Sequence, residues 1–340
     1  MNLVLKNRLY WAGAFVVSSL AFAIWSINHS LRDAAAPPNQ NSVPLTQIQG
    51  PLGPAFDLRG LTVPAAEIQS GGPPKDGIPA LTNPAMVTGG NATYLRPSDR
   101  VIGVFADSQA RAYPLRILNY HEIVNDRIGQ LPIAVTYCPL CDSAAVFDRR
   151  TPLGEREFGV SGLLYNSNVL MYDRGGQSES LWSQVKTQGI SGPAADKSLR
   201  AVPLELTTWK DWLTRYPNTQ VLSEQTGHRR DYGRSPYAGY FTNPQLMFPV
   251  QPVSNALPTK TPVLGVWTDD GTARAYPLSA FGNADSTLQD TVGGKNVTIA
   301  FHREANRLRV VEADEGLHWM YSLWFAWYAF HPDTSISSSP

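Results

Sequence analysis

The feature that most constrains the fold of this 340-residue chain is an internal repeat. The segment from Val101 to Leu115 recurs from Val263 to Leu278, and the six-residue sequence ARAYPL is identical in both. The alignment continues through two later pairs of segments, 124–130 with 288–294 and 133–138 with 297–302. We therefore predict a duplicated unit at residues 101–150 and 263–312.

Both copies consist of short apolar runs separated by turn residues, which predicts a strand, turn and strand, then a short helix or loop, then a hairpin and a last strand. Neither copy alone has many apolar residues to bury, so we expect the two to pack together. The 27 glycines and 27 prolines provide many turns, and nine tryptophans provide large apolar side chains. The predicted fold is mainly β (α+β), in one compact domain with a few short helices.

The overall charge is balanced, with 28 Lys and Arg against 28 Asp and Glu. A balanced charge gives no electrostatic reason to expect nucleic acid as a partner.

The only two cysteines, Cys138 and Cys141, lie in a Cys-Pro-Leu-Cys turn between two apolar runs, and His121 precedes them. Two thiolates and an imidazole suit copper(I) or zinc and are poor ligands for magnesium or calcium. The repeat places His302 at the position of Cys138, so His302 is a candidate fourth ligand, as is His318. A soft metal site, in metal handling or in a metalloenzyme, is the first hypothesis.

Two other interpretations of the cysteine pair stay open, because a single CxxC is a weak signal for a metal. A CxxC pair in an exported protein is typical of a thiol–disulfide oxidoreductase. However, Asp142–Arg149 reads as a turn into a strand, and a thioredoxin-like pair would open a helix. The third interpretation is an envelope interaction module whose cysteines are only structural, although a short-loop disulfide stabilises a fold less than a long-loop one.

Three further pairs of polar residues are candidates for positioning or binding. Glu122 and Asp126 would orient the ring of His121, Tyr165 and Asn166 would line a pocket, and Arg230 and Asp231 would bind an anionic substrate. Each also has a plainer interpretation as turn residues or as a solvated salt-bridging loop.

The N-terminus predicts a membrane anchor. Lys6 and Arg8 precede the uncharged run Leu9–Ile27, which is close to the roughly twenty residues that cross a bilayer as a helix. We assign residues 1–30 to a signal anchor whose positive side stays in the cytoplasm. A cleaved signal peptide, cut after Ala23, is the alternative.

The segment 31–54 is rich in proline and polar residues and is expected to be a flexible linker. The remaining domain, 55–335, would then lie on the periplasmic or extracellular side, with the cytoplasmic membrane as a partner. That compartment is oxidising, which bears directly on the two thiols.

Several separate motifs, among them YHEIVND at 120–126 and VTYCPLC at 135–141, resemble those of the DUF3179 family of bacterial and archaeal proteins. The resemblance covers roughly residues 95–335 and implies an exported or membrane-anchored protein, but it implies no mechanism. The motifs are YHEIVND at 120–126, VTYCPLC at 135–141, YNSNVLMYDR at 165–174, SLWSQ at 180–184 and RDYGRSPY at 230–237.

Overall fold

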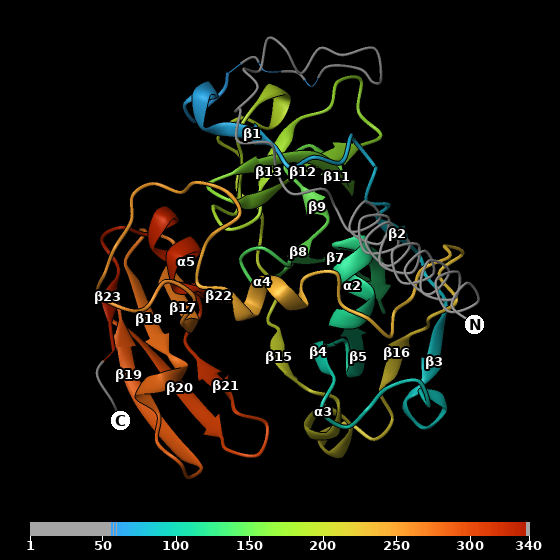
Figure 1. Cartoon of the computed structure of the whole chain (residues 1–340), viewed down its shortest axis with the longest axis vertical. Coiled ribbons are helices and arrows are strands. Elements are labelled where there is room, and N and C mark those ends of the chain that lie inside the picture. Colours follow the sequence, from blue (N-terminus) through green and yellow to red (C-terminus); the bar gives the residue numbers. More distant parts are fainter. Residues whose placement is uncertain (1–55, 57, 59, 338–340) are drawn as a thin grey trace, which may run out of the picture. The chain divides into compact units, whose positions relative to one another are not determined.

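The computed structural model describes residues 56, 58 and 60–337 of the chain. The predicted anchor (1–30) and linker (31–54) lie outside these residues. Within the described ranges, no helix is both long and apolar enough to cross a membrane. As predicted, the described part is mainly β with a few short helices (Figure 1).

The first copy of the repeat begins with a hairpin whose strands pair from Val101↔Pro114 to Ala106↔Gln109. A short helix follows directly after Pro114, whose fixed φ suits the start of a helix. Three antiparallel strands complete the copy. Its elements are β4 (Arg100–Ala106), β5 (Gln109–Pro114), α2 (Leu115–His121), β6 (Ile123–Ile128), β7 (Leu131–Cys138) and β8 (Ser143–Asp148).

The second copy has the same order of elements, which confirms the predicted duplication. Its first hairpin pairs Val263 with Pro277, and its later strands are also antiparallel. Its elements are β17 (Pro262–Thr268), β18 (Ala273–Pro277), the 3-10 helix η5 (Leu278–Ala280), β19 (Ser286–Val292), β20 (Lys295–His302) and β21 (Arg307–Ala313).

Both copies extend further than the sequence predicts. In each, the chain adds a strand antiparallel to the first strand of the unit, then a helix, and then a strand parallel to the second strand. In the first copy these are β15 (Glu205–Thr208), α3 (Trp209–Arg215) and β16 (Gln220–Leu222), and in the second they are β22 (Leu317–Leu323), α5 (Trp324–Phe330) and β23 (Ser335–Ile336).

One eight-stranded sheet joins the two copies, in the order β2-β6-β7-β8-β22-β17-β18-β23, where β2 is Leu81–Thr82. Within this sheet the copies meet where Tyr321 in β22 pairs with Ala144 in β8. A five-stranded sheet, β15-β4-β5-β16-β3, belongs to the first copy, with β3 at Met86–Thr88. The strands β19-β20-β21 form a sheet of their own in the second copy.

The first copy carries a long insertion between β8 and β15, and most of it pairs with β1 (Ile68–Ser70) in a further five-stranded sheet, β1-β11-β12-β13-β14. The strands of the insertion are β9 (Arg150–Thr151), β10 (Gly154–Glu155), β11 (Glu157–Tyr165), β12 (Asn168–Arg174), β13 (Leu181–Ser183) and β14 (Gln188–Gly189). The remaining short helices are η2 (Ala65–Glu67), η3 (Gly89–Asn91), η4 (Gly192–Ala194) and α4 (Ala238–Thr242).

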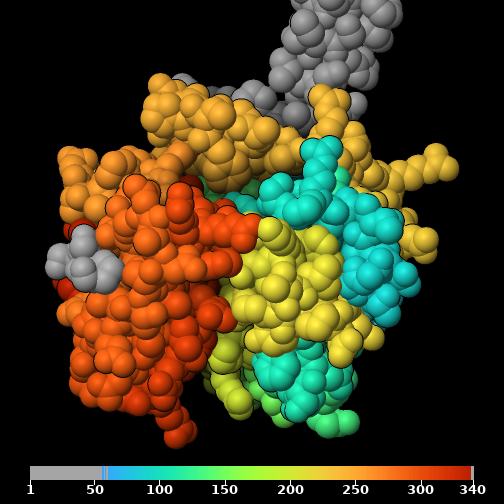
Figure 2. Space-filling view, turned by 90° about the horizontal axis from the view of Figure 1, so that it is seen from below, coloured from blue at the N-terminus to red at the C-terminus, as the bar shows by residue number. Residues whose placement is uncertain are grey.

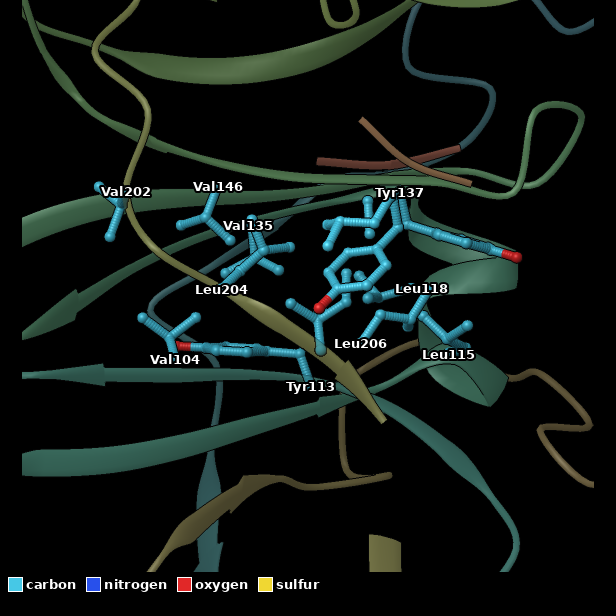
Figure 3. Packing of buried hydrophobic residues seen from close by; sticks show 14 of the residues in the cluster. Val104, Tyr113, Leu115, Leu118, Val135, Tyr137, Val146, Val202, Leu204 and Leu206 are labelled. Carbon is cyan, nitrogen blue, oxygen red and sulfur yellow. The ribbon is translucent and has the colours of Figure 1, made fainter. Parts of the chain in front are cut away.

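The largest apolar core cluster draws on both copies and includes Tyr113 and Val135 of the first together with Tyr276 of the second. In Figure 3, side chains from β4, β5, α2, β7, β8 and the 202–206 segment point into one interior space. Each fully buried Val or Leu there stabilises the fold by about 1.5–3 kcal/mol. A second cluster contains Cys138, Cys141 and the tryptophans of α5.

Candidate functional site: a buried cysteine turn

The two cysteines lie in the tight turn that joins β7 to β8. Cys138 pairs with Ser143 at the mouth of the turn, and Asp142 takes a positive φ of 47° to close it. Both cysteines are free thiols with exposures of 1% and 0%. Their sulfurs converge on the carbonyl oxygen of Ser167, at 3.2 Å from Cys141 Sγ and 3.9 Å from Cys138 Sγ.

The Ser167 carbonyl is held there by the β11–β12 hairpin of the insertion. Asn166 and Ser167 have φ values of 49° and 63°, which is the two-residue turn that a right-twisted hairpin favours. The Asn166 Oδ1 atom accepts a hydrogen bond from the Gln251 N–H at 3.0 Å. Tyr165 packs edge-on against Phe330, with ring centroids 5.4 Å apart. Asn166 therefore shapes the turn, as the plainer interpretation of this pair expects.

The pKa values of the two thiols are shifted in opposite directions. Burial raises the pKa of Cys138, but hydrogen bonds from the Cys141 thiol and from nearby backbone groups outweigh it and lower that pKa below its ordinary value. Burial, together with the hydrogen bond and charge of Cys138, raises the pKa of Cys141 well above its ordinary value. Cys138 therefore loses its proton more readily than Cys141, whose thiol lies 3.2 Å from the Ser167 carbonyl oxygen.

The carboxyl group of Glu122 belongs to the same site. Glu122 follows the last residue of α2 and is only 7% exposed. Its pKa is raised well above the usual range, first by burial and then by the charge of Cys138. Its backbone has φ 56° and ψ −34°, which is a strained combination for a residue with a side chain. The fold therefore holds a buried carboxyl group with a raised pKa beside the cysteine turn, at some conformational cost.

Two tyrosines of the segment around α4 complete the site. The charges of Glu122 and Cys138 contribute to the raised pKa of Tyr237, after burial. Those of Cys141 and Cys138 do the same for Tyr240. The Tyr240 hydroxyl is buried and has no hydrogen-bond partner within the described residues. Tyr237 is the N-cap of α4, and the spacing of three residues places its ring and that of Tyr240 on one face of the helix.

A buried hydrogen-bond network supports the turn from the side of the insertion. The Ser143 hydroxyl donates to Gln184 Oε1 at 2.6 Å, and Asn168 Nδ2 donates to the same oxygen at 2.8 Å. The Gln184 amide in turn donates to Thr136 Oγ1 at 2.9 Å. Because every member is satisfied, the network fixes the turn in one conformation. Its members are too far apart in the sequence for a local motif to reveal them.

His121 is fully buried but is engaged elsewhere. Its Nδ1 atom lies 2.7 Å from the Pro79 carbonyl oxygen and its Nε2 atom 2.6 Å from the Tyr232 hydroxyl. Burial lowers the pKa of His121 to about 4, so the ring is neutral and uses both nitrogens in hydrogen bonds. The ring ties the loop that carries Tyr232 to the end of α2, and neither nitrogen is left for a metal ion.

His302 lies in the corresponding turn of the second copy and does not reach the cysteines. Its Nδ1 atom pairs with Asp211 Oδ1 at 3.0 Å. His318 pairs with Asp269, 2.7 Å away. Within residues 60–337, no three His, Cys, Asp or Glu side chains are grouped closely enough to hold a metal ion. The four ligands expected from the sequence thus do not meet at one point, because the repeat places equivalent residues in different sheets. Binding of copper or zinc itself stays a prediction.

Asp126, expected to orient His121, has other partners. Its Oδ2 atom accepts hydrogen bonds from Arg111, at 2.5 Å, and from the Tyr113 hydroxyl, at 2.7 Å. The second copy repeats this arrangement at Asp290, with Arg274 and Tyr276. Since the second copy lacks both cysteines, this triad belongs to the scaffold.

Arg230 and Asp231 are exposed in the loop before α4. The Asp231 carboxylate accepts a hydrogen bond from the backbone N–H of Gly233, and its carbonyl accepts one from Tyr120. The guanidinium of Arg230 makes one long contact, at 3.5 Å, with the neighbouring carbonyl of Arg229. Within the described residues, no hydrogen bond or ion pair links either side chain to the cysteine turn.

Fold and site together define a class of mainly β proteins built on a duplicated unit with one buried CxxC turn. The chain belongs to the DUF3179 family, described as proteins of unknown function, whose family model matches residues 75–316. The matched range lies inside the predicted domain, 55–335. Comparison with curated proteins and with solved structures finds no match.

Proposed function

We propose that Cys138 and Cys141 form a dithiol–disulfide couple that exchanges electrons with a small disulfide, with Glu122 as its proton donor and acceptor. One observation carries the proposal: two free thiols converge on one carbonyl oxygen in a buried site that also holds a carboxyl group with a raised pKa. The lowered pKa of Cys138 favours the attacking thiolate, and the raised pKa of Cys141 keeps the second thiol protonated until the second step of a disulfide exchange.

The exchange proceeds in two displacements. The Cys138 thiolate attacks one sulfur of the disulfide RSSR′, the S–S bond breaks, and R′S⁻ takes the proton of Glu122. The Glu122 carboxylate then takes the Cys141 proton, and the Cys141 thiolate attacks the Cys138 sulfur. RS⁻ leaves with the proton from Glu122, which regains one from solvent. Two electrons pass from the cysteines to the disulfide, giving RSH, R′SH and a Cys138–Cys141 bond.

Access to the thiols is controlled by the segment that carries Tyr237 and Tyr240. Because the sulfurs are at most 1% exposed, a disulfide reaches them only when this segment moves away. Exclusion of water in the closed state strengthens the interaction of Glu122 with the thiolate. The unpartnered Tyr240 hydroxyl is available to donate a hydrogen bond to a bound sulfur or to a polar group of the substrate.

The test is a redox titration of the purified full-length chain. The protein is equilibrated in buffers of reduced and oxidised dithiothreitol, free thiols are trapped by alkylation, and the product is weighed by mass spectrometry. We expect one reversible transition from two alkylated cysteines to none, which Cys138→Ser and Cys141→Ser each abolish. If both cysteines remain alkylated at every ratio of the two reagents, the couple does not exist.

Glu122→Gln is the matched variant for the proton-transfer step, because it keeps the shape of the side chain and removes its proton donor. We expect the end point of the titration to change little and the rate of exchange with oxidised glutathione to fall about 100-fold. An unchanged rate would remove Glu122 from the reaction while leaving the couple itself intact.

Binding of copper or zinc by the same two sulfurs is a second proposal, favoured by two adjacent thiols of which one has a lowered pKa. Metal analysis of the full-length chain separates the two. A stoichiometric metal ion that is lost in Cys138→Ser and kept in His121→Ala supports this proposal, because His121 is engaged elsewhere.

We further propose that the domain works outside the cytoplasmic membrane, held there by the predicted anchor at residues 1–30. The basic residues Lys6 and Arg8 before the uncharged run support this orientation. Protease added to spheroplasts should degrade the domain, whereas a domain that is protected until the membrane is broken would place it inside.

A further inference from the structure

A small cavity lies where the two copies of the repeat meet, next to Asp142 of the cysteine turn. Its volume is about 50 Å³. Since one water occupies about 10–15 Å³ on this measure, the cavity has room for a few waters or for one small oxyanion. Most of its wall is apolar, and its charged residues are Arg100, Asp142 and Arg307.

The charges around the cavity do not balance. Arg100 pairs with Asp142 Oδ2 at 2.9 Å, and Asp142 Oδ1 accepts the hydroxyl of Tyr137 at 2.7 Å. The one carboxylate is therefore fully used. Arg307 has no carboxylate within ion-pairing distance in the part of the chain that the structure describes, and it donates only to the carbonyl of Asn306, at 2.7 Å. Two cations thus face one anion.

Hydrogen bonding around the cavity is also incomplete. The Nε atoms of Arg100 and Arg307 are both buried and have no partner within residues 60–337. Buried donors without an acceptor are uncommon in folded proteins, and each one suggests a missing partner. Burial and the charge of Arg100 lower the pKa of Arg307 to about 10, which is the response of a cation that lacks a counter-charge.

We propose that this cavity binds a small oxyanion, either the carboxylate of a small organic acid or an inorganic oxyanion, between Arg307 and Arg100. The planar guanidinium group presents a fork of donors that matches two oxygens of such an anion. The surrounding side chains Leu206, Leu264 and Leu308 exclude water and so strengthen the ion pair. This site goes beyond the dithiol couple and does not depend on it.

The cavity opens toward a larger groove between the copies. The groove has a volume of about 590 Å³ and shares Leu206, Arg307 and Leu308 with the cavity. Figure 2 shows the second copy, in orange to red, meeting the yellow part of the first copy along a seam. The same seam gives a small molecule a route to Arg307, whereas the cysteines are reached from the side of α4.

The site is tested by thermal unfolding of the full-length chain, in one detergent buffer, with added sodium acetate or sodium sulfate and with sodium chloride at equal ionic strength. We expect acetate, sulfate or both to raise the melting temperature of the wild type more than chloride does. Arg307→Gln should lose this difference and weaken binding of the effective anion at least tenfold. The two salts distinguish a site for carboxylates from one for inorganic oxyanions.

Arg303→Gln is the matched control, because it removes the same charge from the exposed side of the same turn. It should respond to the anions as the wild type does. In chloride alone, Arg307→Gln should melt no lower than the wild type, since it removes an uncompensated charge. The proposal is overturned if the anions protect the wild type and Arg307→Gln equally, or if chloride protects as well as they do.

Discussion

The two copies of the repeat share a scaffold and differ in chemistry. The turns 139–142 and 303–306 have the same length, and Asp142 and Asn306 close them with nearly the same φ, 47° and 49°. The first turn is buried, whereas His302 at the mouth of the second exposes 41% of its side chain. The difference arises outside the repeat, because the first copy alone carries the β9–β14 insertion and is covered by the segment around α4.

The shared scaffold is specific down to single contacts. A Cβ atom on Gly103 would lie 2.3 Å from the ring of Trp212, and one on Gly265 would lie 2.2 Å from that of Trp327. Each indole also donates to a threonine hydroxyl, at 2.9 Å and 3.0 Å respectively. Both copies therefore keep the same packing of a tryptophan against a glycine. The buried site at the turn 139–142 arises from the β9–β14 insertion and the segment around α4, which the second copy lacks.

The largest expected effect comes from removing these indoles. Trp212→Ala and Trp327→Ala should each lower the free energy of unfolding by about 3–5 kcal/mol, because each leaves a large cavity against a strand. Urea unfolding of the full-length chain measures the loss. Val311→Ala, on an exposed side chain, is the control and should cost about 0.5 kcal/mol or less. A cost near that of the control for one tryptophan alone would mean that the copies are not equivalent in packing.

Acid should weaken both copies through one histidine each, His121, which is fully buried, and His331, which is partly buried. Burial lowers the pKa of His121 and of His331 to about 4, below the ordinary 6.5. The unfolded chain therefore binds more protons between pH 6.5 and 4, and the free energy of unfolding falls as the pH falls through this range. Each histidine contributes at most about 1.4 kcal/mol per pH unit. His121→Gln and His331→Gln should each flatten the curve of unfolding free energy against pH, and a slope unchanged by both would contradict this assignment.

The Arg–Asp–Tyr triads should differ in strength between the copies. Asp126 exposes 7% of its side chain and Asp290 exposes 20%. Asp126→Asn should cost about 3 kcal/mol, because it leaves the partly buried Arg111 without its counter-charge. Asp290→Asn should cost about 1.5 kcal/mol. Thermal unfolding at neutral pH gives both values, and a larger loss at Asp290 would reverse the relation between burial and strength.

Much of the fold could be predicted because the duplication is visible in the sequence. The ARAYPL segments fixed the register of the two hairpins, and the strands that followed were placed correctly. The extension of each copy was missed because only the spacing of its tryptophans repeats, Trp209 with Trp212 and Trp324 with Trp327. The aligned glycines Gly103 and Gly265, each of which a tryptophan of the extension packs against, are a signal that could have revealed the extension.

The site was harder to predict because its contacts link distant parts of the chain. The turn with Cys138 and Cys141 and the adjacent Glu122 stood out locally. The partner of His121 is 111 residues away in the sequence, in a loop whose polar composition gave no indication of that contact. A histidine near two cysteines is typical of a metal ligand, so His121 was predicted to be one. The hydrogen bond to Tyr232 instead gives His121 a structural role.

The smallest expected change in stability comes from transplanting the cysteines. His302→Cys with Ala305→Cys, made in a Cys138→Ser and Cys141→Ser background, gives the second copy the same CxxC turn. The aligned turns make the substitution compatible with the backbone, and loss of the half-exposed ion pair to Asp211 should cost about 1 kcal/mol or less.

The transplanted pair should nevertheless behave as ordinary thiols. Among residues 60–337, no counterpart of Glu122 or Tyr240 covers the second turn, so the rate of alkylation should rise with pH around a pKa of about 8.5. The native pair should react far more slowly at every pH because it is buried. If the two pairs instead showed the same pH profile, the difference in pKa between the two thiols would arise from the CxxC turn itself. The covering segments would then have no part in the chemistry.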